Sequence, residues 1–190
     1  MNSKNILIVL GEPFSVFSVI IAKYFTHMNN LDHKIIIIGN LALLKRQLKK
    51  LSYSIPLNKI NNVGESKKKI INVIDINFEN KKTFSKITNS SNIYIENCFN
   101  KSLEILKKNK DFILINGPIS KKSFLKKKFL GVTEYIANKT NSKNEVMLIY
   151  NDKVSVSPIT THIPIKDVAK KITKEKIIRK IKKIESFYKL

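Results

Sequence analysis

Three short runs of apolar residues, each closed by a glycine or a glycine-containing turn, constrain the fold of this chain most strongly. They span residues 5–10, 34–38 and 111–115, and Gly11, Gly39 and Asn116-Gly117 follow them. Continuous apolar runs of this length are typical of strands buried on both faces of a parallel sheet. The pattern therefore predicts an α/β fold with strands at these three places.

Helices are predicted between and after these strands. An apolar helix is predicted from about Val16 to Met28 with Ser15 as its N-cap, and apolar residues recur at helical spacing over 41–51, where Asn40 is the predicted N-cap. Strand, helix, strand, helix at this spacing indicates parallel βαβ units. The remaining predictions are an irregular connection over 52–90 with a strand at 70–76, a helix from Ser90 or Ser91 to Lys108, a hairpin of 145–150 and 154–157, and a helix from Thr173 to about Tyr188.

The composition limits the function classes. The chain has 190 residues, 43% of them hydrophobic, and a formal net charge of +22. A dense positive charge would suit a nucleic-acid partner, but only Arg46 and Arg179 are arginines, and base and phosphate recognition relies on the arginine fork. Lys, Ile and Asn are abundant along the whole chain. We interpret the charge as a solvated lysine-rich surface that reflects coding bias, and we expect no nucleic-acid or membrane partner.

The single cysteine and the apolar N-terminal stretch indicate in which cellular compartment the protein is expected. The single cysteine, Cys98, falls in a predicted helix, where a small buried hydrophobe is expected, and it excludes a disulfide framework. Residues 6–22 imitate a signal peptide, but Glu12-Pro13 interrupts them and no small-residue cleavage site follows. The sequence therefore favours a cytoplasmic protein without a transmembrane segment.

Three polar motifs follow one another between the later apolar runs. They are Gly117-Pro118-Ile119-Ser120-Lys121, Gly131-Val132-Thr133-Glu134 and Thr160-Thr161-His162-Ile163-Pro164-Ile165. Function in open α/β sheets collects at the carboxyl ends of strands, which is where the first motif lies. No dinucleotide-binding G-x-G-x-x-G or Walker pattern occurs in the sequence.

Each motif carries a candidate site residue with an ordinary structural alternative. His162 stands in a proline-stiffened loop and is a candidate ligand for a divalent metal, or a structural loop histidine. Thr133 and Glu134 open a helix, which is a ready anion site, or a simple N-cap. Lys121 could meet a phosphate as a point charge, although lysines are frequent nearby. His27 and His33 are expected at the surface.

These motifs resemble those of the 4-hydroxythreonine-4-phosphate dehydrogenase family of vitamin B6 synthesis, which read G-P-[IV]-x-K, G-H-T-E and T-T-H-x-P-[IL]. The resemblance runs from about Ile6 to the end of the chain and is strongest over 111–168. It implies an isocitrate/isopropylmalate dehydrogenase-like three-layer α/β/α fold, incomplete at the C-terminus. Residues 1–116 would belong to a first domain, and residues 117–190 would begin a second, dimer-forming domain.

The resemblance also implies an activity, namely NAD-dependent oxidation and decarboxylation of 4-phosphooxy-L-threonine with a divalent metal (Zn, Mg or Co), by a cytoplasmic homodimer. It places Thr133, Lys121 and the position of Val132 at the substrate, and His162 as the first of three metal ligands. The family's histidine is Val132 here, and the other two ligands have no counterpart in the chain. We therefore expect the 190-residue chain alone to be inactive. The alternative is a non-catalytic remnant or a basic anion-binding α/β module.

Overall fold

The computed structural model describes residues 5–27, 33–126, 128–143 and 145–189. The chain divides into two compact units, residues 2–126 and residues 127–190. The family-based domain boundary between residues 116 and 117 stays a prediction. Within the described parts of the chain, no helix combines the length and the apolar character that crossing a bilayer requires.

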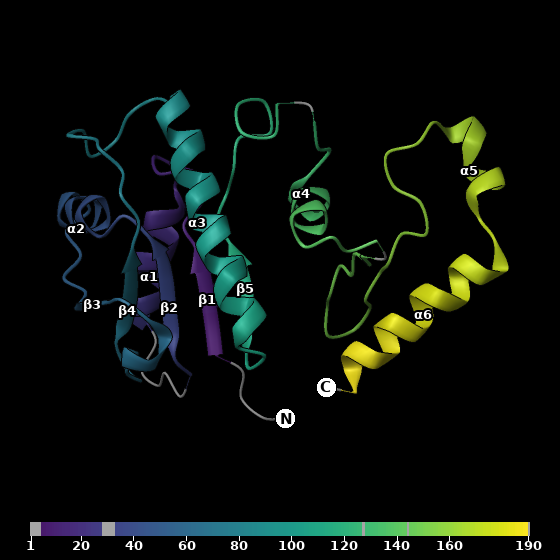
Figure 1. Ribbon diagram of the computed structural model, residues 1–190, viewed down its shortest axis with the longest axis horizontal. Coiled ribbons are helices and arrows are strands. Elements are labelled where there is room, and N and C mark those ends of the chain that lie inside the picture. Colours follow the sequence, from purple (N-terminus) through teal and green to yellow (C-terminus); the bar gives the residue numbers. More distant parts are fainter. Residues whose placement is uncertain (1–4, 28–32, 127, 144, 190) are drawn as a thin grey trace. The chain divides into compact units, whose positions relative to one another are not determined.

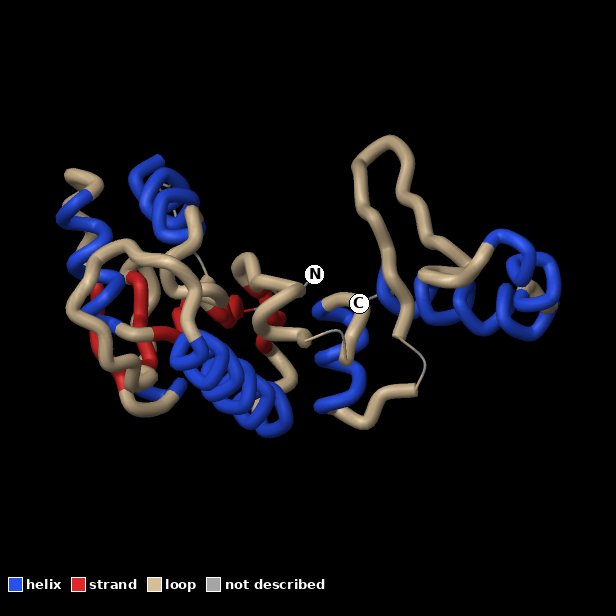
Figure 2. The backbone as a smooth tube through the Cα atoms, turned by 90° about the horizontal axis from the view of Figure 1, so that it is seen from above, coloured by secondary structure: helices blue, strands red, loops and turns tan. Residues whose placement is uncertain are grey.

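The first unit is a five-stranded parallel sheet with helices on both faces (Figure 1). Its strand order is β3-β4-β2-β1-β5, so the first strand of the chain lies inside the sheet. The tube view of Figure 2 shows strands between helices. The elements are β1 (Asn5–Val9), α1 (Phe17–His27), β2 (Ile35–Gly39), α2 (Leu41–Lys50), β3 (Leu57–Ile60), a 3-10 turn (Val63–Glu65), β4 (Ile71–Asp75), α3 (Asn89–Lys108) and β5 (Phe112–Asn116). The predicted α/β fold class is confirmed.

The apolar runs of β1 and β2 contribute to the core, as predicted. The prediction of a buried strand at 111–115 is wrong in its burial: β5 stands at the end of the strand order, only Phe112 is buried, and Ile113 and Ile115 are each 43% exposed. Every residue of β2 is buried, and α1 and α2 pack with β2 and β4 in one cluster on one face of the sheet. On the other face, α3 contacts β1, β2 and β5 and buries Ile95, Cys98 and Phe99 completely. The prediction of a buried Cys98 is thus confirmed. Helices cover both faces of the sheet at β2, which explains the absence of alternation in this strand.

The predicted helix starts are partly right. Asn40 caps α2, since its side chain accepts a hydrogen bond from the backbone N–H of Leu43 at 2.8 Å. The cap of α3 was predicted at Ser90 or Ser91 and is Thr88, which accepts from the N–H of Ser91 in a capping box. Ser91 is the third helical residue of that box, so the cap was predicted two or three residues too late.

The connection over 52–90 contains more structure than predicted. The strand expected at 70–76 is present as β4, but the edge strand β3 was missed. Asn72, fully buried in β4, holds this region together: its amide donates to the carbonyls of Ile35, Lys67 and Ile70, and its oxygen accepts from Asn58. A buried amide with its hydrogen-bonding groups satisfied can fix the position of a strand. The apolar pattern of the sequence does not reveal this contribution.

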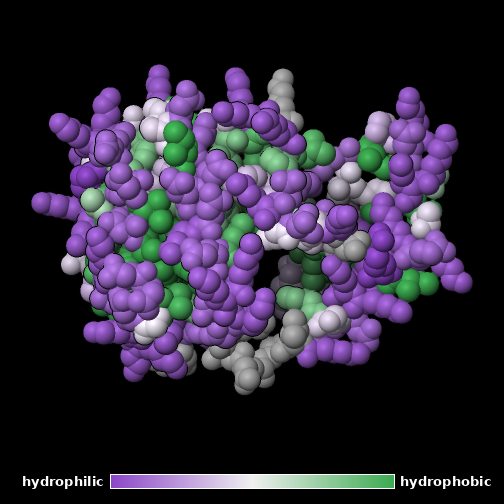
Figure 3. All heavy atoms as spheres, viewed as in Figure 1, coloured by the Kyte–Doolittle hydropathy of each residue, from purple (hydrophilic) through white to green (hydrophobic). Residues whose placement is uncertain are grey.

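The second unit contains α4 (Val132–Lys139), α5 (Ile165–Lys171) and α6 (Lys174–Tyr188). The predicted hairpin is reduced to one antiparallel bridge between Ile149 and Val156. Thr173 caps α6 as predicted. Neither α5 nor α6 has a buried residue, and Ile149, Val156 and Ile165 are more than half exposed. Large apolar side chains therefore stay open to solvent in this unit, while most of the face in Figure 3 is hydrophilic.

Candidate functional site

The loops that follow β1 and β5 interlock in the first unit. The N–H of Gly117 donates to the carbonyl of Val9 at 2.7 Å, and the N–H of Glu12 donates to the carbonyl of Pro118 at 2.8 Å. Gly11 has a φ of +73°, and a Cβ there would lie far inside contact distance of the Pro118 oxygen. A Cβ on Gly117 would meet the Leu10 backbone in the same way. Both glycines are thus required by a backbone-to-backbone contact.

Lys121 follows these loops in a turn of the same unit. Ser120 organises this turn, because its side-chain oxygen accepts from the N–H of Ser123 at 3.1 Å and its carbonyl accepts from the N–H of Phe124 at 2.8 Å. The Lys121 side chain is exposed. Lys121 belongs to the first unit, whereas Val132, Thr133 and His162 belong to the second. The substrate role of Lys121 therefore stays a prediction.

The second motif begins helix α4, as the sequence predicted. Gly131 is the N-cap and makes no side-chain cap hydrogen bond, while Val132 and Thr133 are half-buried in the first turn. The carboxylate of Glu134 folds back over Gly131, where an added Cβ would come within 2.9 Å of its Oε2. The side chain of Val132 has no hydrogen-bonding group, so at this position the chain offers a substrate only apolar contact.

His162 lies in an exposed loop with a φ of +57°, a left-handed conformation that a non-glycine residue seldom adopts. Ser52, Lys69, Lys126 and Asn141 share this conformation, so it does not by itself mark His162 as a site residue. Within the described ranges, no three His, Cys, Asp or Glu side chains gather where they could hold a metal ion. A catalytic zinc normally takes three protein ligands, so the residues present do not complete a metal site.

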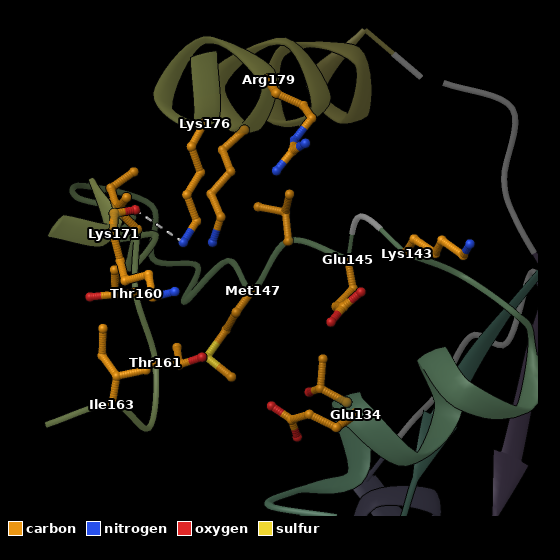
Figure 4. Close-up of a pocket in the computed structure, with 14 residues that line it drawn as sticks. Glu134, Lys143, Glu145, Met147, Thr160, Thr161, Ile163, Lys171, Lys176 and Arg179 are labelled. Carbon is orange, nitrogen blue, oxygen red and sulfur yellow. Dashed lines mark hydrogen bonds between the residues drawn. The ribbon is translucent and has the colours of Figure 1, made fainter. Parts of the chain in front are cut away.

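A cavity of about 260 Å³ lies within the second unit (Figure 4). Its wall combines the second motif, the two threonines of the third motif and a basic side of α6. The lining residues are Thr133, Glu134, Lys143, Glu145, Val146, Met147, Ile159, Thr160, Thr161, Ile163, Lys171, Lys176, Arg179 and Lys180. Figure 4 shows Lys176 and Arg179 extending from α6 into the space that Glu134 and Glu145 border from another side.

The positive charges on α6 crowd one another. Lys176 and Lys180 are one helical turn apart and Arg179 lies beside them, so all three reach the same cavity. Burial lowers the pKa of Lys180, the neighbouring charge of Lys176 lowers it further, and Glu145 partly opposes both effects. Lys180 donates to the carbonyl of Pro158 at 2.8 Å, and Lys176 donates to that of Lys171 at 3.4 Å. An anion in the cavity would relieve this repulsion.

The structure thus brings together some of the predicted site residues. Thr133 lines the same cavity as Thr160 and Thr161, while His162 is not among its lining residues. The sequence reading missed the basic side of α6. Its signal was available in the i, i+3, i+4 spacing of Lys176, Arg179 and Lys180, but lysine is so frequent in this chain that the spacing did not stand out.

Comparisons with known proteins agree with this architecture. Solved structures of 4-hydroxythreonine-4-phosphate dehydrogenases from Klebsiella pneumoniae and Burkholderia phymatum superpose with TM-scores of 0.83 and 0.82 at 20% sequence identity. They match 99% and 96% of this chain, which correspond to 59% and 57% of those proteins. The class is therefore an α/β protein with the fold of these dehydrogenases.

Sequence comparison gives the family. The family model for "Pyridoxal phosphate biosynthetic protein PdxA" matches residues 31–190. The 4-hydroxythreonine-4-phosphate dehydrogenase of Sulfurihydrogenibium sp. (strain YO3AOP1) is 31% identical, over 97% of this chain and 58% of the relative. The D-threonate 4-phosphate dehydrogenase of Salmonella typhimurium is 26% identical, over 87% and 53%. The chain belongs to the PdxA family and spans somewhat more than half the length of these relatives.

Proposed function

We propose that this chain supplies the first part of an NAD-dependent 4-hydroxythreonine-4-phosphate dehydrogenase that acts in pyridoxal phosphate synthesis as a cytoplasmic homodimer. The observation that carries the proposal is the cationic cavity of the second unit, into which two of the family's motifs bring Thr133, Thr160 and Thr161. The relatives are named as 4-hydroxythreonine-4-phosphate and D-threonate 4-phosphate dehydrogenases, and both substrates carry a phosphate ester. The cavity offers a phosphate cationic side chains and hydroxyl groups.

The chemistry of the cavity supports binding of the phosphate. Lysine ammonium groups and threonine hydroxyls donate hydrogen bonds to phosphate oxygens. Because Lys180 is held close to Lys176, a bound dianion would replace a repulsion with an attraction. Val132 gives no hydrogen bond where the family has histidine, so we assign phosphate recognition in this chain mainly to Thr133 and the basic side of α6.

The redox chemistry is proposed for a longer protein that contains this chain. In the family, NAD accepts the hydride and a divalent metal (Zn, Mg or Co) polarises the oxygen that becomes a ketone. His162 is the residue of this chain that we expect to reach the metal. Because the described residues offer no second and third ligand beside it, we derive no metal-dependent step from this chain.

A non-catalytic anion-binding module remains the second candidate. The completeness of the cationic cavity within residues 127–190 favours it, since binding there needs no further segment. Binding alone cannot separate the two candidates, because both predict it. Turnover by a longer protein would separate them.

The test of the cavity is a calorimetric titration of the 190-residue chain with 4-phosphooxy-L-threonine. Lys180→Met removes a charge-assisted hydrogen bond, for which a loss of about 1.5–3 kcal/mol corresponds to roughly 10- to 150-fold weaker binding. Lys153→Met is the matched control, because Lys153 is an exposed lysine of the same unit that does not line the cavity. Equal affinity of the two variants would reject the cavity as the phosphate site.

The test of the enzyme is an activity assay with the same substrate, NAD and added Zn²⁺, Mg²⁺ or Co²⁺. We expect no turnover from the 190-residue chain, since one imidazole cannot hold a catalytic divalent ion. A longer in-frame protein should turn over, and His162→Ala should abolish most of its activity and bound metal while leaving the circular dichroism spectrum unchanged. Full activity with normal metal content in His162→Ala would show that the ligand role is misassigned.

A further inference from the structure

A second small cavity, inside the sheet unit, is associated with a buried glutamate that the proposed function does not use. The cavity has a volume of about 10 Å³, which is room for one particle of the size of a water molecule. It lies where the loop after β1 meets the start of α2 and the side of α3, and all of its lining residues belong to the first unit: Leu10, Glu12, Pro13, Ser15, Phe17, Ser18, Asn40, Leu43, Leu44, Gln47 and Tyr94.

The carboxylate of Glu12 lines this cavity and is buried, which disfavours its charged form. It is only 6% exposed, and among the described residues neither of its carboxylate oxygens has a hydrogen-bond partner. Burial raises its pKa, while the backbone N–H of Phe14 and the hydroxyl of Ser91 act in the opposite direction without reaching hydrogen-bond geometry. A desolvated carboxylate needs a counter-charge or a proton.

The two side-chain amides that line the cavity with Glu12 direct their nitrogens to backbone carbonyls. The Asn40 amide nitrogen donates to the carbonyl of Ile76 at 3.0 Å, and the Gln47 amide nitrogen donates to Pro13 and Thr83 at 2.7 and 3.1 Å. The Gln47 nitrogen is thus engaged with carbonyls, which leaves its oxygen for the cavity, whereas the Asn40 oxygen already accepts the helix-capping hydrogen bond from the N–H of Leu43 at 2.8 Å.

Two hydroxyls complete this set of oxygens. Ser18 is 5% exposed, and its hydroxyl oxygen has no partner in the described structure. The Tyr94 hydroxyl accepts from the N–H of Asn40 at 2.8 Å. One carboxylate among neutral amide and hydroxyl oxygens is the ligand set that hard cations prefer.

We propose that this cavity is a binding site for one monovalent cation, Na⁺ or K⁺, held by the Glu12 carboxylate, the Ser18 hydroxyl and the amide oxygen of Gln47. The single negative charge balances a single positive charge, and the volume admits one unhydrated ion. The lining comes from the loop after β1 and from α1, α2 with its N-cap, and α3, and the proposed ligands would fasten that loop to α1 and α2. The proposal is independent of the phosphate cavity, which lies in the other unit.

The test is thermal unfolding of the 190-residue chain in potassium, sodium and choline chloride at equal ionic strength. Choline is too large for the cavity and keeps general salt effects constant. We expect a saturable rise in the melting temperature with one of the small cations, of about 3–6 °C at ten times the dissociation constant. Glu12→Gln should lose this rise, and Glu79→Gln, which makes the same charge change at an exposed position, should keep it.

Three outcomes would overturn the proposal. Identical melting of the unmodified chain in all three salts would mean that a proton or a water molecule satisfies Glu12. An equal rise in Glu12→Gln would mean a general salt effect. If Glu12→Gln does not fold, crystals of the unmodified chain soaked in a thallous salt decide: anomalous density beside the Glu12 carboxylate supports the site, and its absence there rejects it.

Discussion

Replacing Gly11 by alanine tests whether the loop motifs are required by backbone contact. An L-residue at a φ of +73° is strained by about 1–2 kcal/mol, and forcing a Cβ against the Pro118 carbonyl and the Gly117 carbonyl carbon, 2.9 Å away, costs about 1–3 kcal/mol more. Alanine also reduces the entropy of the unfolded chain, which returns about 0.4–1 kcal/mol. The free energy of unfolding should therefore fall by roughly 1–4.5 kcal/mol.

Urea unfolding followed by circular dichroism measures this loss. With a slope of about 2 kcal/mol per molar, a loss of 2 kcal/mol lowers the midpoint by about 1 M. Gly64→Ala is the control, because its φ is not positive and the atom nearest to its added Cβ is the end of the Asn62 side chain at 3.0 Å. Its midpoint should move by less than half as much. Equal shifts for the two variants would refute the argument from interlocked loops.

Three further predictions concern single side chains. Asn72→Leu should lower the free energy of unfolding by about 2–4 kcal/mol in urea titration, because it leaves several buried backbone groups unpaired; a loss below 1 kcal/mol would contradict this. Burial holds the pKa of Glu12 above its ordinary 4.5, so its stabilising contribution is complete below that value and is lost as pH rises through the higher folded pKa. Glu12→Gln, measured in choline chloride, should therefore gain stability relative to the unmodified chain as pH rises through this window, and a constant difference would refute the assignment. Val132→His in a longer active protein should lower KM for the phosphorylated substrate by up to about tenfold, for roughly 1.4 kcal/mol, and an unchanged KM would show a pocket rebuilt around valine.

The inner strands could be predicted from the sequence because burial on both faces leaves a continuous apolar signal, which the strands at 5–9 and 35–39 carry. The strand at 112–116 was also found from its apolar run, although this edge strand buries only Phe112. The strand β3 could not be found in the same way: Leu57–Ile60 is a four-residue edge strand with one buried residue, and its pairing partner supplies the rest of its stability. Helix α5 was missed because it is short and buries nothing.

The candidate site was harder to predict than the fold. Motif spacing pointed to Thr133, but it could not show which lysines share its cavity, because charged side chains at a surface carry no periodic burial signal. Gly11 and Gly117 are more than 100 residues apart, so their contact cannot be read from either motif alone. His162, Lys121 and the proposed cofactors keep the status of predictions until metal and substrate are measured.

The position of β1 inside the sheet has a consequence for synthesis of the protein on the ribosome. One edge of β1 pairs with β2 soon after it emerges, but the other edge waits for β5, whose Phe112 pairs with Asn5. At about 5–20 residues per second, translation of the intervening segment takes on the order of 5–20 s. During that time, a strand with the buried side chains Leu7 and Val9 presents free backbone groups to other nascent chains. A chaperone that shields residues 5–9 until residue 116 has left the ribosome would therefore have most of its effect on yield, and little on the stability of the finished fold.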